Sequence, residues 1–144
     1  MKHLRKFNES SVEDIKSNLE DILSDFSDNY IPVEVRNLRE ITILPRYQHG
    51  RRSLFSITLG DEYADLDMIS IVPSDNKDEF LRIFDYMESE GYEFSSMSYD
   101  YSGDIVILKI EQIGLGIDSF SNQLFNGIDE TCYLKLFFRK KWDT

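Results

Sequence analysis

The sequence predicts a single α+β domain, in which a mainly antiparallel sheet of about six strands carries two helices on one face. Two segments, residues 11–27 and 75–90, space their apolar residues as amphipathic helices do. Six other segments alternate apolar and polar residues, which is typical of half-buried strands. Hairpin-type links join neighbouring strands, so the predicted order is αβββαβββ and the pairing is mainly antiparallel.

The first helix is expected over about residues 11–27, after a capping box formed by Ser10 and Glu13. The turn-prone residues 28–29 end it. The second helix is expected over residues 75–90, and Gly91 follows where a left-handed C-cap belongs. The two apolar stripes consist of Val12, Ile15, Leu19, Ile22, Leu23 and Phe26, and of Phe80, Ile83, Phe84 and Met87.

Turn signals bound most of the predicted strands. Pro45 and Pro73 end two of them, because proline cannot donate a hydrogen bond to a ladder. Ser102 and Gly103 form a two-residue hairpin signal between two others. Residues 118–128 fit either a short helix or an ordered loop. The six strands are expected at residues 33–43, 55–59, 66–72, 92–101, 104–113 and 132–138.

The composition excludes several classes of protein. A hydrophobic content of 41%, with ten Phe and eight Tyr, argues against disorder. Cys132 is the single cysteine, so no intrachain disulfide can form and a reducing compartment is expected. No apolar run approaches the roughly 20 residues of a membrane helix, and the basic start lacks the apolar core of a secretory signal. These absences favour a cytoplasmic protein without membrane contact. Cys132 and the two histidines have no metal-ligand spacing, so we expect no metal site and no cofactor.

Negative charge is concentrated in the middle of the chain. The net charge is −11, and residues 53–130 contain seventeen acidic and three basic residues. Residues 1–52 are neutral overall, whereas residues 131–144 have a net charge of +3. Such a potential repels phosphate backbones and attracts basic protein surfaces, so we expect a protein partner and no direct nucleic-acid binding. The alternative is that these acids only keep a small protein in solution.

The densest acidic cluster and a tyrosine-rich hairpin are the candidate binding surface. Tyrosine is common at interface hot spots, although these rings could instead pack on the face of the sheet. Asp65 directly precedes the predicted strand 66–72, and Asp67 lies within it. Because the two residues are two apart on extended backbone, their carboxylates would share a face and could hold Mg²⁺. The candidate surface consists of Asp61, Glu62, Asp65, Asp67, Tyr99, Asp100 and Tyr101.

The sequence Asp65-Leu66-Asp67-Met68 resembles the D-x-D element of nucleotidyltransferases of the polymerase-β type. That family also needs a Gly-Ser pair on the preceding strand-to-helix turn. This chain has Gly60-Asp61 in its place, only five residues before Asp65, so the phosphate-binding turn is missing. A metal-dependent nucleotidyltransferase-like enzyme is therefore an alternative to a binding protein, and we expect no catalytic residues.

The first ten residues, MKHLRKFNES, contain three basic residues and precede the first predicted helix. They resemble the start of short uncharacterised proteins of large tailed bacteriophages. They are also similar to the capsid-targeting peptide of T-even-like internal head proteins, with Met1, Lys2, Phe7 and Glu9 at the matching positions. This resemblance implies cleavage between Glu9 and Ser10, in a tag accessible to a protease. Residues 1–9 would then be a flexible basic tag and residues 10–144 the folded domain.

Together these observations predict a phage protein that acts by binding and not by chemistry. Its partner would be a host or phage protein with a basic surface, in the cytoplasm of the infected host cell. Inhibition of a host defence or nucleic-acid enzyme is the most concrete form of this hypothesis. The alternative from the N-terminal resemblance is an internal or structural head protein packaged in the virion. The sequence leaves the identity of the partner and the oligomeric state open.

Overall fold

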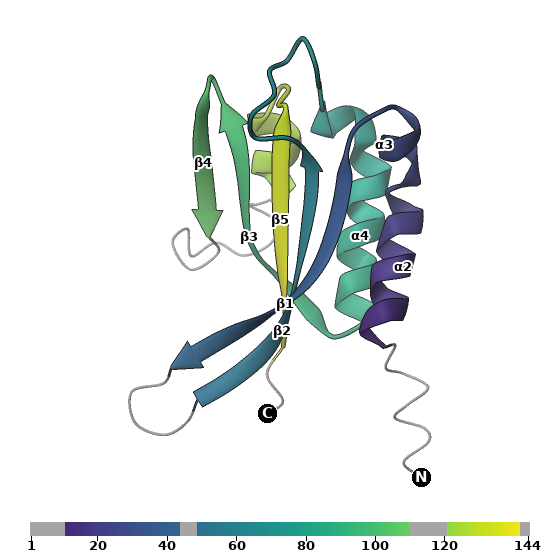
Figure 1. Cartoon of the computed structure of the whole chain (residues 1–144), viewed down its shortest axis with the longest axis vertical. Coiled ribbons are helices and arrows are strands. Elements are labelled where there is room, and N and C mark those ends of the chain that lie inside the picture. Colours follow the sequence, from purple (N-terminus) through teal and green to yellow (C-terminus); the bar gives the residue numbers. More distant parts are fainter. Residues whose placement is uncertain (1–10, 44–48, 110–120, 142–144) are drawn as a thin grey trace.

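The computed structural model describes residues 11–43, 49–109 and 121–141, and it contains one five-stranded antiparallel sheet (Figure 1). The strand order across the sheet is β1-β2-β5-β3-β4, so β1 and β4 are the two edges. The predicted α+β class with a mainly antiparallel sheet is confirmed. The strands are β1 (Val33–Ile43), β2 (His49–Gly60), β3 (Tyr92–Tyr101), β4 (Asp104–Lys109) and β5 (Tyr133–Lys140).

Two main helices, α2 (Val12–Ile22) and α4 (Lys77–Ser89), lie side by side against the same face of the sheet (Figure 1). The short helix α3 (Ser24–Asp28) follows α2, and a 3₁₀ turn η1 (Pro73–Asn76) precedes α4. A π-helical turn η2 (Gln123–Gly127) occupies part of the segment for which the sequence left helix or loop open. None of the described helices is both long and apolar enough to cross a membrane.

The first helix begins one residue later than predicted. Ser11 is the N-cap, and its Oγ accepts a hydrogen bond from the backbone N–H of Asp14 at 3.1 Å. Ser10 lies outside the described residues. The single predicted helix is two helices, because the backbone leaves the helical conformation at Leu23. A tight bond from Phe26 N–H to Leu23 O, at 3.0 Å, accompanies this break, and both side chains lie in the core.

The core lies between the helices and the alternate residues of the central strands. Phe55, Ile57 and Leu59 of β2 pair with Phe138, Leu136 and Leu134 of β5, and these six side chains are almost completely buried. Burying one such side chain contributes about 1.5–3 kcal/mol. The period-two pattern therefore predicted both strands, although β2 begins at His49, six residues before the predicted start at residue 55. The helices cover them with Ile15, Leu19, Phe80, Ile83 and Met87.

Two predicted turns are confirmed. Ser102 and Gly103 both have positive φ values, 53° and 91°, as a type I′ hairpin between β3 and β4 requires. Gly91 has a φ of 85° directly after α4, as expected of a left-handed C-cap. The predicted strand 104–113 is present as far as Lys109, and residues 110–113 lie outside the described part of the chain.

The predicted strand at residues 66–72 is wrong. Residues 66–68 form a turn, and within residues 66–72 only Ile71 makes an isolated bridge, to Thr131. The physical reason is local, because the side chain of Asp65, directly before the segment, accepts hydrogen bonds from the backbone N–H groups of Asp67 and Met68 and so favours a turn over strand pairing. The sheet therefore has five described strands. The predicted order αβββαβββ contains the unit αβββ twice, but β5 lies between β2 and β3, so the two halves do not form two equivalent units.

Candidate functional site

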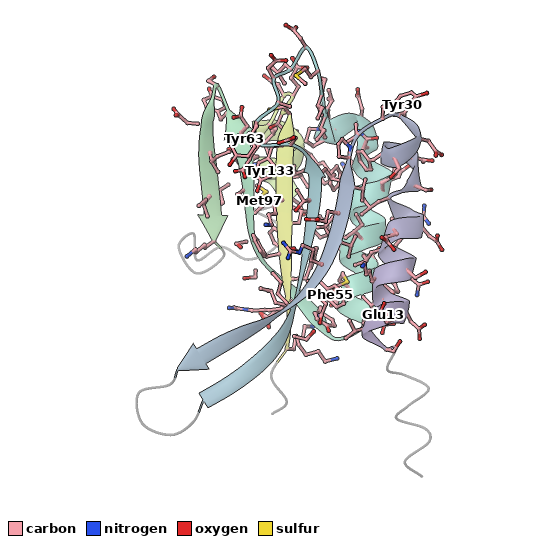
Figure 2. The ribbon with its side chains drawn as sticks, in the orientation of Figure 1. Glu13, Tyr30, Phe55, Tyr63, Met97 and Tyr133 are labelled. Carbon is pink, nitrogen blue, oxygen red and sulfur yellow. The ribbon has the colours of Figure 1, made fainter. Side chains whose placement is uncertain are left out.

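Three segments far apart in the sequence meet at the end of the sheet where β2 ends and β5 begins. They are the loop at residues 61–70, the β3–β4 hairpin and the segment 127–132. Together they enclose an open cleft of roughly 500 Å³. Tyr63 and Tyr133 lie toward this end of the sheet, whereas Phe55 lies toward the other end (Figure 2).

Carboxylates dominate the lining of the cleft. Five acidic side chains line it, and no lysine, arginine or histidine is among the described residues that do so. Two like charges about 4 Å apart repel by about 1 kcal/mol in water and by more where protein displaces the solvent. The cleft is therefore a local source of negative potential. The five acidic residues are Asp65, Asp67, Asp100, Asp129 and Glu130.

Two aspartates give the loop at residues 61–70 its shape. Asp61 Oδ1 accepts a hydrogen bond from Tyr63 N–H at 2.9 Å. Asp65 Oδ1 accepts hydrogen bonds from the backbone N–H groups of Asp67 and Met68, each at 3.1 Å. Asp65 and Asp67 thus belong to one turn, and their predicted placement along a strand with a shared face is wrong. The resemblance to a strand-borne D-x-D element loses its structural basis.

The loop is tied to the sheet at both ends. Asp61 N–H donates to Cys132 O at 3.0 Å, and the backbones of Ile71 and Thr131 exchange two hydrogen bonds of 2.8 and 2.9 Å. Inside these anchors, Cys132 Sγ–H donates to Ala64 O at 3.2 Å. Hydrogen bonds therefore hold the loop against residues 131–132, which directly precede β5.

A side-chain contact also joins the loop to the segment 127–132, because Ser70 Oγ–H donates a hydrogen bond to Glu130 Oε2 at 2.5 Å. The hydroxyl of the buried Thr131 lies within hydrogen-bond distance, 2.9 Å, of the carbonyl oxygens of Asp100 and Tyr133. These contacts join the segment 127–132 to the loop on one side and to β3 on the other. The carboxylates of the three segments are thereby held at one end of the molecule.

Cys132 is buried at the floor of the cleft and is a poor nucleophile. Burial raises the pKa of its thiol, and the negative charges of Asp100 and Asp65 raise it further. A thiol reacts as its thiolate, which these surroundings disfavour. The Cys132 thiol therefore stays protonated and has a structural role, as the donor of a hydrogen bond to the backbone carbonyl of Ala64.

Large apolar side chains are exposed on two of the segments that form the cleft, the loop at residues 61–70 and the β3–β4 hairpin. Nine described residues of this kind are exposed, and six of them lie on the 61–70 loop and the β3–β4 hairpin. Tyr63 is 90% exposed and Met68 is 73% exposed, values that leave most of each side chain in water. A local concentration of exposed apolar groups is typical of an interaction surface. The six residues are Tyr63, Leu66, Met68, Tyr101, Ile105 and Ile107.

Most residues of the predicted binding surface lie together at this end of the molecule. Asp61, Glu62, Asp65, Asp67 and Tyr101 are exposed on the loop and the hairpin. Asp100 is half-buried, and its Oδ1 accepts a 3.4 Å hydrogen bond from Gly103 N–H within the turn.

Tyr99 was predicted to lie on the surface, and this is wrong, because its side chain is only 5% exposed. It pairs with Leu134 of β5 and with Val106 of β4, on the face of the sheet that the helices cover. Its hydroxyl accepts a hydrogen bond from Gln123 Nε2 at 3.1 Å. Strand alternation assigns Tyr99 to the core once the register is known.

Sequence reasoning missed Asp129, Glu130, Tyr63, Leu66 and Met68. The first two reach the cleft because the Ile71–Thr131 bridge brings their segment beside the loop. Leu66 and Met68 fall in the predicted strand 66–72, and Tyr63 was assigned to no element. The close spacing of Asp61 and Asp65, which are typical turn formers, is the signal that could have indicated a surface loop. The predicted cleavage site at Glu9 and Ser10 lies outside the described residues.

Two basic residues of β5, Arg139 and Lys140, lie at the opposite end of that strand from the cleft. Arg139 forms an ion pair with Glu93 at 3.7 Å, and Lys140 Nζ donates to Glu90 O at 3.0 Å. Both contacts are near the C-terminal end of β5, six and seven residues from its start at Tyr133. These cations therefore make their contacts away from the acidic cleft.

No group of three or more His, Cys, Asp or Glu side chains in the described residues is arranged to hold a metal ion. Comparison of the chain with protein-family models, with curated proteins and with solved structures found no match.

Proposed function

We propose that the acidic cleft and the apolar side chains around it bind a protein partner with a basic surface. The observation that carries this proposal is the coincidence of two features at one end of the molecule. Five carboxylates line the cleft and no described cation lines it, and four exposed apolar side chains, Tyr63, Leu66, Met68 and Tyr101, lie on the same loop and hairpin. Apolar anchors supply binding energy, while complementary charge speeds and orients the encounter.

From the N-terminal resemblance we infer that this binding takes place in the cytoplasm of a bacterium infected by a phage. A protein with a basic surface in that cell is commonly one that handles nucleic acid, because such proteins must attract phosphate. A cluster of carboxylates can occupy a groove that otherwise receives a phosphate backbone. The concrete form of the proposal is inhibition of a host defence or nucleic-acid enzyme by occupation of its basic surface.

A charge-reversal experiment tests this proposal. The side chains of Asp61, Asp65 and Asp100 accept backbone hydrogen bonds and should be kept, so the reversed residues are Glu62, Asp67 and Asp129. Wild type and the triple lysine variant are compared as baits for affinity capture from host lysate, followed by association kinetics with each captured protein. We expect an association rate about tenfold or more lower for the variant, with a weaker salt dependence.

The matched control reverses three exposed acids on the outer side of α4, Asp78, Asp85 and Glu88. It has the same net charge as the cleft variant but keeps the cleft intact. We expect its capture and association rate to remain close to wild type. Equal loss in both variants would assign the effect to overall charge, and no loss in either would contradict the proposal.

The virion alternative depends on residues 1–9, which the structure does not describe, and it stays a prediction. Mass spectrometry of purified virions tests it directly, because a packaged protein would be present with or without its first nine residues.

A further inference from the structure

The two edges of the sheet differ in how they are protected. The β1 edge has charged residues at positions 34 and 36, and charges on an edge strand discourage the addition of another strand. The β4 edge has four consecutive apolar residues, Ile105 to Leu108, and no proline. Ile105 and Ile107 are 42% and 58% exposed. Among the described residues, no strand pairs with the outer side of β4.

The hairpin geometry tells which backbone groups of β4 face outward. In a two-residue hairpin, the residues that flank the turn form a hydrogen-bonded pair, and such pairs recur at every second position. Tyr101 and Asp104 flank the turn, so Val106 and Leu108 direct their N–H and C=O groups toward β3. The N–H and C=O groups of Ile105 and Ile107 therefore point away from the sheet, where they can pair with another strand.

We propose that β4 pairs antiparallel with β4 of a second copy of this chain. A two-fold axis perpendicular to the sheet would join the two five-stranded sheets into one continuous sheet of ten strands. This proposal is independent of the partner bound at the acidic cleft.

The register follows from two conditions. Opposite residues must lie on the same face, and residues with outward hydrogen-bonding groups must face each other. Pairings centred on Val106 or on Ile107 meet both conditions. The Val106-centred register pairs Ile105 with Ile107 of the second copy twice, because the sequence Ile105-Val106-Ile107 reads the same in both directions. The Ile107-centred register would place Ile105 opposite Lys109, so the Val106-centred register is favoured.

The charges along β4 also suit a second copy. Asp104 and the half-buried Asp100 lie at the hairpin end, and Lys109 lies at the other end. Antiparallel pairing in this register places Lys109 beside the hairpin turn of the second copy, and the two-fold axis repeats that contact. The net charge of −11 on each copy opposes association at long range, but physiological ionic strength screens it beyond about 8 Å.

Sedimentation velocity over a concentration series at physiological salt tests the proposal. We expect a monomer–dimer equilibrium for the full chain. Ile107→Lys should weaken it by about tenfold or more, because the substitution occurs twice in the interface. Leu81→Lys is the matched control, since Leu81 is an exposed apolar residue on α4, away from β4, and it should leave the equilibrium unchanged. A chain that stays monomeric, or an Ile107→Lys variant that dimerises like wild type, would overturn the proposal.

Disulfide cross-linking tests the register. In the proposed dimer, position 106 faces itself in a non-hydrogen-bonded pair, with Cα atoms about 4.5 Å apart, which a disulfide can bridge. The two copies of position 108 would be about 14 Å apart, beyond disulfide reach. With oxidised glutathione, Val106→Cys should give a covalent dimer, whereas Leu108→Cys and wild type should remain monomers under denaturing electrophoresis. Equal cross-linking of both variants, or none, would overturn the register.

Amide hydrogen exchange on wild type decides the question if the variants fail to fold. The amides of Ile105 and Ile107 should become protected as the concentration rises through the dimer range. Protection that does not depend on concentration would mean that this chain covers its own edge, and absent protection would mean an open edge. Either result would overturn the proposal.

Discussion

Replacing Gly60 by alanine should lower the free energy of unfolding by roughly 2–5 kcal/mol, because two penalties coincide there. Gly60 has a φ of +81°, in the left-handed region, which costs another residue about 1–2 kcal/mol. A Cβ at this position would also overlap the carbonyl oxygen of Cys132 and lie 2.9 Å from its carbonyl carbon. That oxygen accepts the bond from Asp61 N–H, so moving it disrupts an anchor of the acidic loop, at a further cost of about 1–3 kcal/mol.

Gly103 provides the matched control. Its φ is +91°, but no heavy atom lies within 4 Å of the position where a Cβ would be. Gly103→Ala should therefore lower the free energy of unfolding only by the cost of the left-handed backbone conformation, about 1–2 kcal/mol. Urea unfolding followed by far-UV circular dichroism measures both losses, and the melting temperature should fall by about 4 °C for each kcal/mol. Equal losses in the two variants would refute the argument from the close approach of Cys132.

Three further predictions concern the core, a helix cap and pH. Phe80→Ala should cost about 3–5 kcal/mol in urea unfolding, because the ring is fully buried and packs 5.7 Å from Phe26 between centroids; a loss below about 1 kcal/mol would contradict this packing. Ser11→Ala should cost about 1 kcal/mol by the same measurement, and Ser11→Asp should keep most of the stability, since either oxygen can cap α2. Stability should fall as pH rises above about 9, because the raised pKa of Cys132 keeps its thiol protonated in the folded state while the unfolded chain loses the proton. Cys132→Ala should flatten that part of the stability–pH curve, and an unchanged slope would assign the loss to other groups.

Elements with local causes were predictable from the sequence. The stripes of α2 and α4, the Ser102-Gly103 turn and the alternation along β2 and β5 each depend on a few neighbouring residues. The strand order was not predictable, because the place of β5 between β2 and β3 depends on pairing between segments more than thirty residues apart. The break at Leu23 was also missed, since the apolar stripe continues through it and carries no local signal of a break.

The candidate site was predictable only in part, for the same reason. Asp61, Glu62, Asp65 and Asp67 are close in sequence, so their clustering needs no tertiary information. Asp129 and Glu130 join them only through the Ile71–Thr131 bridge.

The side of the sheet that Tyr99 occupies depends on register, which a shift of one residue would reverse. Sequence alternation therefore grouped Tyr99 with its neighbours on the hairpin, although its ring packs in the core. The error on strand 66–72 has a different origin. Leu66 and Met68 are apolar residues of an exposed turn, and their alternation with polar neighbours resembles the pattern of a half-buried strand.

Because the 61–70 loop is anchored at both ends, its inner residues can determine which partner binds, while the sheet keeps its structure. Because Asp61 and Ile71 are fixed to the backbone of residues 131–132, the residues between them can change without altering the register of the sheet. Lengthening such a loop twofold costs only about 0.6 kcal/mol in closure entropy. The same framework could thus accommodate different loops for different partners, and a peptide epitope inserted after Tyr63 should be displayed without loss of the fold.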